Sequence, residues 1–378
     1  MGVKTPSEAK NSVYRRSDEN MPKKVIELRH KVCDYTCMWN GIEDLYGTKL
    51  GEDIPDYFFF CLSGIGKFVY LKFSSGNMRR MASWNDGRTK KMYASICNIV
   101  GFKYKHIEGR KFEYVMKRAK EQIDNERPVV LGCLDMYYLS YYPKFYYKEH
   151  IPIHYILMVG YDDEEQCAYV YDCGIEKLQK IKYETLKKAM NIEKTSLSDK
   201  NSICLIEFDD KIKSIREIAI RGFYEKAREM LNPKVGFCGI PGMRKLSKEI
   251  LNWKDELTAE EYETALKHIV MCTGTVPILP NRLTKIEEKD EIEHQAARRE
   301  YANLLMQLGD KYGFQQWKVA ADLFEKSGII IQEMTDLIVD YLLKEIKELN
   351  RLPYMINDIA DLEEKAYHRI LEGIKNEA

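Results

Sequence analysis

The feature that most restricts the fold of this chain is the distribution of strand-like segments, which are confined to the first 210 of its 378 residues. Four short runs there are β-branched or aromatic and bounded by turn residues: residues 128–133, 154–159, 167–171 and 203–208. Residues 37–46 and 113–125 instead carry apolar side chains at helical spacing. The first part of the chain is therefore expected to mix strands and helices.

From about residue 211 onward, every apolar segment has helical periodicity. The predicted helices cover residues 212–231, 241–253, 259–272, 288–312, 317–327, 331–349 and 357–376. Thr258 and Glu261 have the spacing of a capping box at the start of one of them. The sequence thus predicts the α+β class, with a disordered polar arm at 1–22, a mixed domain at 23–210 and a helical domain at 211–378.

Charge and cysteine usage restrict the possible partners. Lys and Arg number 59, as do Asp and Glu, so no basic excess favours nucleic acid. No apolar run reaches the roughly 18 residues of a membrane helix, and the polar start lacks the apolar region of a secretory signal. Ten cysteines at irregular spacing are typical of reduced thiols rather than a disulfide framework. We expect a cytoplasmic protein that binds neither membrane nor nucleic acid.

Two cysteines, Cys33 and Cys37, lie at or near the start of the first predicted helix. Unpaired amides and the helix dipole favour a thiolate in the first turn of a helix, and we expect Cys33 there. Cys37 would lie one turn deeper and face the core, which makes Cys33 the predicted nucleophile. His30, Cys33 and Cys37 also offer three metal ligands, but a second ligand pair at zinc-finger distance is lacking, so no metal is expected.

A histidine and an aspartate occupy matching ends of two successive predicted strands. His154 opens one strand, a turn follows at 162–165, and Asp172 follows the next strand. In an antiparallel hairpin the start of one strand lies beside the end of the next. His154 and Asp172 are therefore predicted to meet as general base and orienting group. His150 competes for the role of base but precedes Pro152 and lies outside the strand.

Cysteine on an early helix, then histidine and aspartate on consecutive strands, is the chain order of papain-like thiol enzymes. The sequence Cys-x3-Cys-Met at 33–38, before a helix ending in Tyr-Gly, resembles the peptidase domains of bacteriocin exporters. The stretch Asp-Met-Tyr-Tyr-Leu-Ser-Tyr at 135–141 and the strand His-Tyr-Ile-Leu-Met-Val-Gly-Tyr-Asp at 154–162 resemble the family of butirosin biosynthesis protein H. Members often carry a helical C-terminal domain, like residues 213–375 here.

The resemblance implies a papain-like fold and acyl transfer rather than proteolysis. The acyl group would pass from the phosphopantetheine thioester of a carrier protein to the enzyme cysteine and then to a small amine, in antibiotic or other natural-product biosynthesis. The amide synthase of closthioamide assembly is a relative that also fits. No further cofactor is implied. Papain-like peptidases place a Gln before the Cys as oxyanion donor, but none occurs at 25–30, so Asn40 and His30 are the side-chain candidates.

An aromatic cluster precedes the histidine strand, with seven aromatic residues in eleven positions at 137–147. Tyr137, Tyr138 and Tyr141 are predicted to line an acyl channel, or alternatively to pack against the helical domain. Asp135 is predicted either to bind the cationic amine or to cap a turn. The basic stretches 79–80, 88–91 and 298–299 are candidate contacts for an acidic carrier protein.

Two other functions remain open from the sequence. A cysteine peptidase or amidohydrolase would use the same three residues with water as the acceptor. A papain-like module that only binds a peptide or carrier would need no reactive cysteine.

Overall fold

The computed structural model describes residues 23–33, 37–76, 78–85, 89–194, 198–274 and 293–375. The predicted arm at 1–22 lies outside these residues. Within them, antiparallel strands and helices make up the first part of the chain, and the part that follows residue 208 is helical. The predicted α+β class with a helical C-terminal region is therefore confirmed. Across the described residues, no helix combines the length and apolarity that crossing a membrane requires.

The main sheet has seven strands in the part of the chain that the structure describes. Its order is β4-β9-β5-β6-β7-β8, with β1 pairing along β6, and every pairing is antiparallel. The strands are β1 (Lys23–Val25), β4 (Phe102–Ile107), β5 (Val129–Leu134), β6 (His154–Asp162), β7 (Cys167–Asp172), β8 (Ile175–Lys182) and β9 (Ile203–Phe208).

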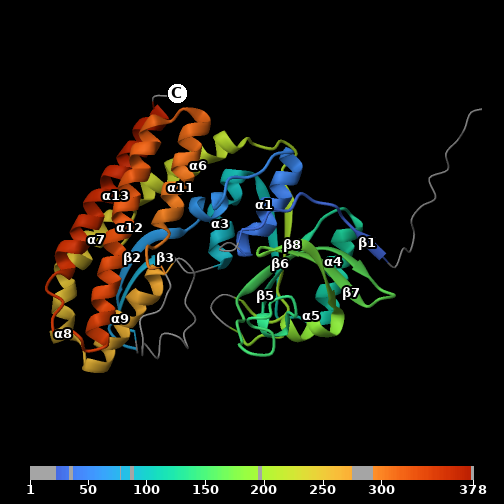
Figure 1. Cartoon of the computed structure of the whole chain (residues 1–378), viewed down its shortest axis with the longest axis horizontal. Helices are drawn as coiled ribbons and strands as arrows, with labels where there is room; N and C mark the ends of the chain where they lie inside the picture. The colour runs from blue at the N-terminus through green and yellow to red at the C-terminus, as the bar shows by residue number, and fades with distance from the viewer. Residues whose placement is uncertain are drawn as a thin grey trace, which may run out of the picture.

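Strand β6 is buried along its whole length because helices cover both faces of the sheet. Alternate side chains of a strand point to opposite faces. Ile156 and Met158 pack with α4 (Phe112–Asp124) and α5 (Tyr183–Ala189). Leu157 lies in the other core, which includes residues of α1 (Cys37–Leu50) and α3 (Thr89–Val100). Figure 1 shows α1 and α3 between the sheet and the helical part.

The helical part packs around the long pair α12 and α13, and Figure 1 shows it beside the sheet. Its helices are α6 (Ile215–Leu231), α7 (Gly239–Glu249), η2 (Ile250–Asn252), α8 (Trp253–Glu256), α9 (Ala259–Thr273), α11 (Arg298–Tyr312), α12 (Gln315–Leu342) and α13 (Leu352–Lys375). A capping box formed by Thr258 and Glu261 begins α9, as predicted.

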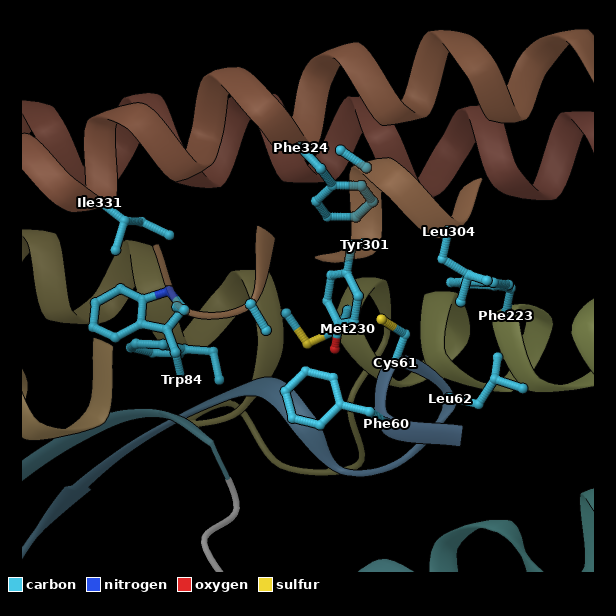
Figure 2. Close-up of a cluster of buried hydrophobic side chains, with 14 of the residues drawn as sticks. Phe60, Cys61, Leu62, Trp84, Phe223, Met230, Tyr301, Leu304, Phe324 and Ile331 are labelled. Carbon is cyan, nitrogen blue, oxygen red and sulfur yellow. The ribbon is translucent and has the colours of Figure 1, made fainter. Parts of the chain in front are cut away.

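One segment of the predicted first domain packs with the helices instead. It comprises α2 (Phe58–Leu62) and the hairpin of β2 (Ile65–Lys72) with β3 (Arg80–Asn85). The hairpin lies against α7 and α9, and Trp253 donates from Nε1 to the hydroxyl of Tyr70 at 3.0 Å. Figure 2 shows side chains of α2 and β3 in one apolar cluster with those of α6, α11 and α12. The domain boundary at residue 210 therefore stays a prediction.

The element boundaries differ from the predictions mainly at glycines and in edge strands. Strand β9 has the predicted bounds. The helix predicted at 37–46 and the strand predicted at 154–159 are both longer than expected, and α1 and β6 continue through Gly47 and Gly160. The helix predicted at 317–327 and most of that predicted at 331–349 form the single helix α12, which ends at Leu342. Strands β1, β2, β3, β4 and β8 were not predicted.

A fully buried ion pair joins two helices of the C-terminal part. Arg298 on α11 donates from Nε and Nη2 to the carboxylate of Glu363 on α13 at 2.8 and 2.7 Å, and Ser327 donates to Glu363 at 2.9 Å. The basic pair at 298–299 is thus not a free docking patch, because Arg298 is buried. Likewise, Arg79 and Arg80 pair with Glu261 and Glu256, and residue 88 lies outside the described residues.

We expect Glu363→Gln to lower the free energy of unfolding by about 3–5 kcal/mol, because it leaves the Arg298 charge buried without an opposite charge. Urea denaturation measures this loss. Thr258→Ala removes a solvent-facing helix cap and serves as the control, with an expected loss of about 1 kcal/mol. A loss for Glu363→Gln no larger than that of the control would contradict the role assigned to the pair.

Candidate active site

His154 and Asp172 meet at one end of the sheet. The pairing of Leu157 with Tyr171 sets the register of β6 and β7, so the last residue of β7 comes within two residues of the first residue of β6. His154 Nε2 is 2.9 Å from both carboxylate oxygens of Asp172. Both side chains are buried, Asp172 completely. The structure therefore brings together the two residues that the sequence paired.

Two tyrosine hydroxyls complete the surroundings of this carboxylate. Tyr142 donates to Oδ1 of Asp172 at 2.8 Å and Tyr141 donates to Oδ2 at 2.9 Å. Burial raises the pKa of Asp172, but the charge and hydrogen bond of His154 and the two hydroxyl donors outweigh that effect and hold its pKa below the usual range. Asp172 is therefore an ionised acceptor, and the Nε2 hydrogen of His154 points to it.

The side chain of Cys37 is hydrogen-bonded to the imidazole of His154. Burial lowers the pKa of His154, but the charge and hydrogen bond of Asp172, together with a hydrogen bond to the Cys37 side chain, raise it to about 10. Because Nε2 faces Asp172, we assign the bond with Cys37 to Nδ1. The imidazole thus bridges a thiol and a carboxylate, the arrangement that activates a thiol nucleophile.

The local structure around Cys37 differs from the prediction in one decisive respect. Helix α1 begins at Cys37, which is partly exposed, so the expectation that Cys33 occupies the first turn was wrong. The buried Cys33 lies four positions earlier, where its amide donates to the Cys173 carbonyl at 2.8 Å. The first-turn environment that favours a thiolate therefore belongs to Cys37.

A close approach of α1 to the sheet holds Cys37 near His154. Gly41 lies one turn after Cys37, and a Cβ at this position would be 3.0 Å from Val130 and 3.4 Å from Leu157. Those distances leave no room for a larger side chain without a shift of the neighbours. The missing side chain at Gly41 thus lets the helix pack directly on β5 and β6.

The thiol of Cys173 also lies close to His154 and Asp172. Its sulfur, a ring nitrogen of His154 and a carboxylate oxygen of Asp172 lie within 4.8 Å of one another, and the group is buried. This is the set of possible metal ligands found within the described residues. The ring nitrogen nearest Asp172 is already hydrogen-bonded to it, so the geometry is that of a hydrogen-bonded dyad. His30, the metal ligand considered from the sequence, is bonded to Asp44 and to the Ile175 carbonyl.

Both side-chain candidates for oxyanion donors make hydrogen bonds within the scaffold. Asn40 donates to the Lys31 carbonyl at 2.8 Å. His30 Nδ1 is 2.7 Å from Asp44 and its Nε2 is 3.0 Å from the Ile175 carbonyl. The oxyanion role of Asn40 and His30 stays a prediction. The first amides of a helix have no partner within the helix, so the start of α1 is an alternative source of donors beside Cys37.

The predicted substrate-binding residues separate into two groups. Asp135 accepts from the amides of Tyr137 and Ile151 and is 2.6 Å from His150 Nδ1, so it caps a turn. Tyr137 stacks on His150 with ring centroids 4.0 Å apart. Tyr138 packs edge-on against Tyr137, whereas the hydroxyl of Tyr141 binds Asp172. Substrate binding by these residues stays a prediction.

The ion pair of His154 and Asp172 makes the free energy of unfolding depend on pH in a defined way. Folding raises the pKa of His154 from 6.5 to about 10, so its contribution is complete below pH 6.5 and is lost as pH rises through about 10. Folding lowers the pKa of Asp172, so its contribution is present above its ordinary value of 3.8 and is lost as pH falls through the lowered value.

We therefore expect wild-type unfolding free energy, measured in urea, to fall more steeply than that of His154→Gln between about pH 6.5 and about pH 10. Other titrating groups contribute equally to both proteins, so the difference in slope isolates His154. Parallel pH profiles would show that His154 is not held as an imidazolium in the folded protein.

The comparisons with known proteins bear on the same residues. Residues 36–173 match the family described as butirosin biosynthesis protein H, N-terminal, and residues 184–275 match a domain of unknown function (DUF4872). A search of curated proteins found no match. The first match includes Cys37, His154 and Asp172 but begins after Cys33. The part of the chain that carries these three residues is therefore similar to the N-terminal region of the butirosin biosynthesis protein H family.

Proposed function

We propose that this protein is a biosynthetic acyltransferase that forms an amide through an acyl thioester on Cys37. The observation that carries the proposal is the hydrogen-bonded series of Cys37, His154 and Asp172. It occurs within the region that is similar to the butirosin biosynthesis protein H family. The proposal keeps His154 and Asp172 in their predicted roles and transfers the role of nucleophile from Cys33 to Cys37.

The chemistry follows from the three side chains. The Cys37 thiolate attacks the carbonyl carbon of an acyl thioester, and the donor leaves as a thiol with the proton that the His154 imidazolium gives up, so one thioester replaces another at little cost in free energy. An amine then attacks the acyl-enzyme, the new C–N bond forms, and the Cys37 sulfur leaves. His154 takes the proton that the amine loses. Asp172 holds the imidazole in one tautomer and orientation. No ATP is needed for either step.

The papain-like fold is part of the same proposal. Support comes from the cysteine at the start of a helix that packs on an antiparallel sheet, with the histidine and aspartate on adjacent strands. A carrier protein as acyl donor, a small amine as acceptor, and kinship with the closthioamide amide synthase are further predictions. The burial of His154 and Asp172 supports transfer to an amine, because a site that excludes water protects the acyl-enzyme from hydrolysis.

Product analysis tests the proposal. Purified protein is incubated with a small acyl thioester, with and without a primary amine, and the products are identified by mass. We expect amide to form faster than free acid in the presence of amine, and neither to form with Cys37→Ala. Free acid as the main product at every amine concentration would indicate a hydrolase, and no turnover of any thioester would favour a binding module.

A further inference from the structure

Asp172 receives more hydrogen bonds than an orienting carboxylate needs for its histidine. Each oxygen accepts one tyrosine hydroxyl, Tyr142 on Oδ1 and Tyr141 on Oδ2, in addition to contact with His154 Nε2. The carboxylate has no solvent exposure, so these donors replace the water that would otherwise solvate its charge. Loss of one donor would leave a buried charge under-solvated.

The segment before the histidine strand is folded so that two neighbouring residues reach one carboxylate. After η1 (Met136–Tyr138), the Tyr142 amide donates to the Leu139 carbonyl at 3.0 Å, and the Tyr146 amide donates to the Tyr142 carbonyl at 2.9 Å. These turns place the rings of Tyr141 and Tyr142 5.1 Å apart, inclined at 48°. Both hydroxyls then converge on Asp172.

Tyr142 also contacts the base itself. Its ring lies 5.5 Å from the His154 ring at an interplanar angle of 89°. An edge-to-face contact of this kind restricts rotation of the imidazole. Burial and the Asp172 charge raise the pKa of Tyr141 and Tyr142, so both remain hydroxyl donors at neutral pH.

We infer that Tyr141 and Tyr142 are positioning residues that keep Asp172 ionised and aligned, and thereby keep His154 as the imidazolium partner of the Cys37 thiolate. This inference rests on the proposed function, in which Cys37 is the nucleophile. It reassigns Tyr141 from the substrate channel to the support of the catalytic residues.

The physical reason is the distribution of one proton between two buried groups. Hydroxyl donors stabilise the carboxylate and so favour the state with the proton on the imidazole. Without them, the carboxylate becomes a stronger base and draws the proton from His154, which leaves less positive charge beside the sulfur. Cys37 should then need a higher pH to become a nucleophile.

The test is the pH dependence of Cys37 alkylation by iodoacetamide, located by peptide mass because the chain has ten cysteines. For Tyr141→Phe and Tyr142→Phe we expect the pH of half-maximal rate to rise by roughly one unit, the size expected for a hydrogen bond to a charged group. In an Asp172→Asn background, the same substitutions should produce no further shift, since no carboxylate is left to support.

Tyr183→Phe is the matched control. Tyr183, the first residue of α5, donates its hydroxyl to Asp163 at 2.8 Å. This variant therefore removes a similar hydrogen bond at a site distant from Cys37, and it should leave the pH profile of alkylation unchanged. Thermal unfolding checks that all variants remain folded at the assay temperature. Equal profiles for Tyr141→Phe, Tyr142→Phe and the control would overturn the inference, as would an equal shift in the Asp172→Asn background.

Alkylation requires no acyl donor, which separates this inference from the proposed function. A shifted profile in a protein that transfers no acyl group would uphold the positioning role and reject the transfer activity. Conversely, active acyl transfer together with unshifted alkylation profiles would uphold the transfer activity and reject the positioning role.

Discussion

Replacing Cys37 with alanine is expected to abolish acyl transfer, with a rate loss of about 10⁴-fold or more, the scale found when a catalytic nucleophile is removed. The reason is that Cys37, the first residue of α1, is hydrogen-bonded through its side chain to His154. The measurement is turnover of an acyl thioester in the presence of amine.

Cys33→Ala is the matched control, because it makes the same substitution four positions earlier. The hydrogen bond that Cys33 makes to the Cys173 carbonyl comes from its backbone amide, which alanine retains. We expect its activity to remain within a few-fold of wild type. Activity retained in Cys37→Ala but lost in Cys33→Ala would restore Cys33 as the nucleophile.

The second large effect is expected for Asp172→Asn, with a loss of about 10²–10⁴-fold in the transfer rate. The substitution keeps the shape of the side chain but removes the charge that holds the proton on His154. Asparagine has one acceptor oxygen for two tyrosine hydroxyls that now bind different oxygens. With that oxygen kept by one hydroxyl, its amide group would face the other hydroxyl and the ring nitrogen. The imidazole would then favour the other tautomer, with its hydrogen directed toward the Cys37 sulfur.

Asp163→Asn tests whether this loss is specific. Asp163 also accepts a tyrosine hydroxyl, that of Tyr183, and pairs with Lys120, but it lies in the turn at the opposite end of β6 and β7 from His154. Turnover should be near wild type in this variant. If both substitutions reduce the rate equally, the effect of Asp172→Asn is on the fold of the sheet and not on the imidazole.

The contact between His154 and Asp172 could be predicted from the sequence because it depends on a local pattern. Strands β6 and β7 are consecutive, apolar and joined by a short turn, so hairpin pairing alone places His154 beside Asp172. The helical character of the second half was equally accessible from the apolar period, and so was the cap at Thr258.

The predictions that failed depend on packing between segments distant in sequence. Gly47 and Gly160 are residues that often end a helix or a strand. However, α1 packs in the core and β6 is buried along its whole length, and such tertiary contacts override local propensity. The polar strand β8 is the last strand at one edge of the sheet, and the short strand β1 pairs, among the described strands, only with β6. Neither has the apolar pattern of the central strands.

Choosing between Cys33 and Cys37 as the proposed nucleophile depends on knowing where α1 starts to within a single turn, and hydrophobic periodicity does not fix helix ends that closely. The spacing of the apolar and aromatic residues after Cys37 is equally compatible with a helix that starts at Cys37 and with a helix that starts a turn earlier. Likewise, nothing local to Tyr141 and Tyr142 indicated Asp172, thirty residues away, as their partner.

The most direct test of the central claim is to locate the acyl group in the wild-type protein. The protein is mixed briefly with an acyl-thioester mimic in the absence of amine, quenched in acid, digested and mapped by mass. We expect a single acyl addition, on Cys37, that disappears when amine is added before the quench. An acyl group on Cys33 or Cys173, or an addition to Cys37 that amine does not discharge, would contradict the central claim.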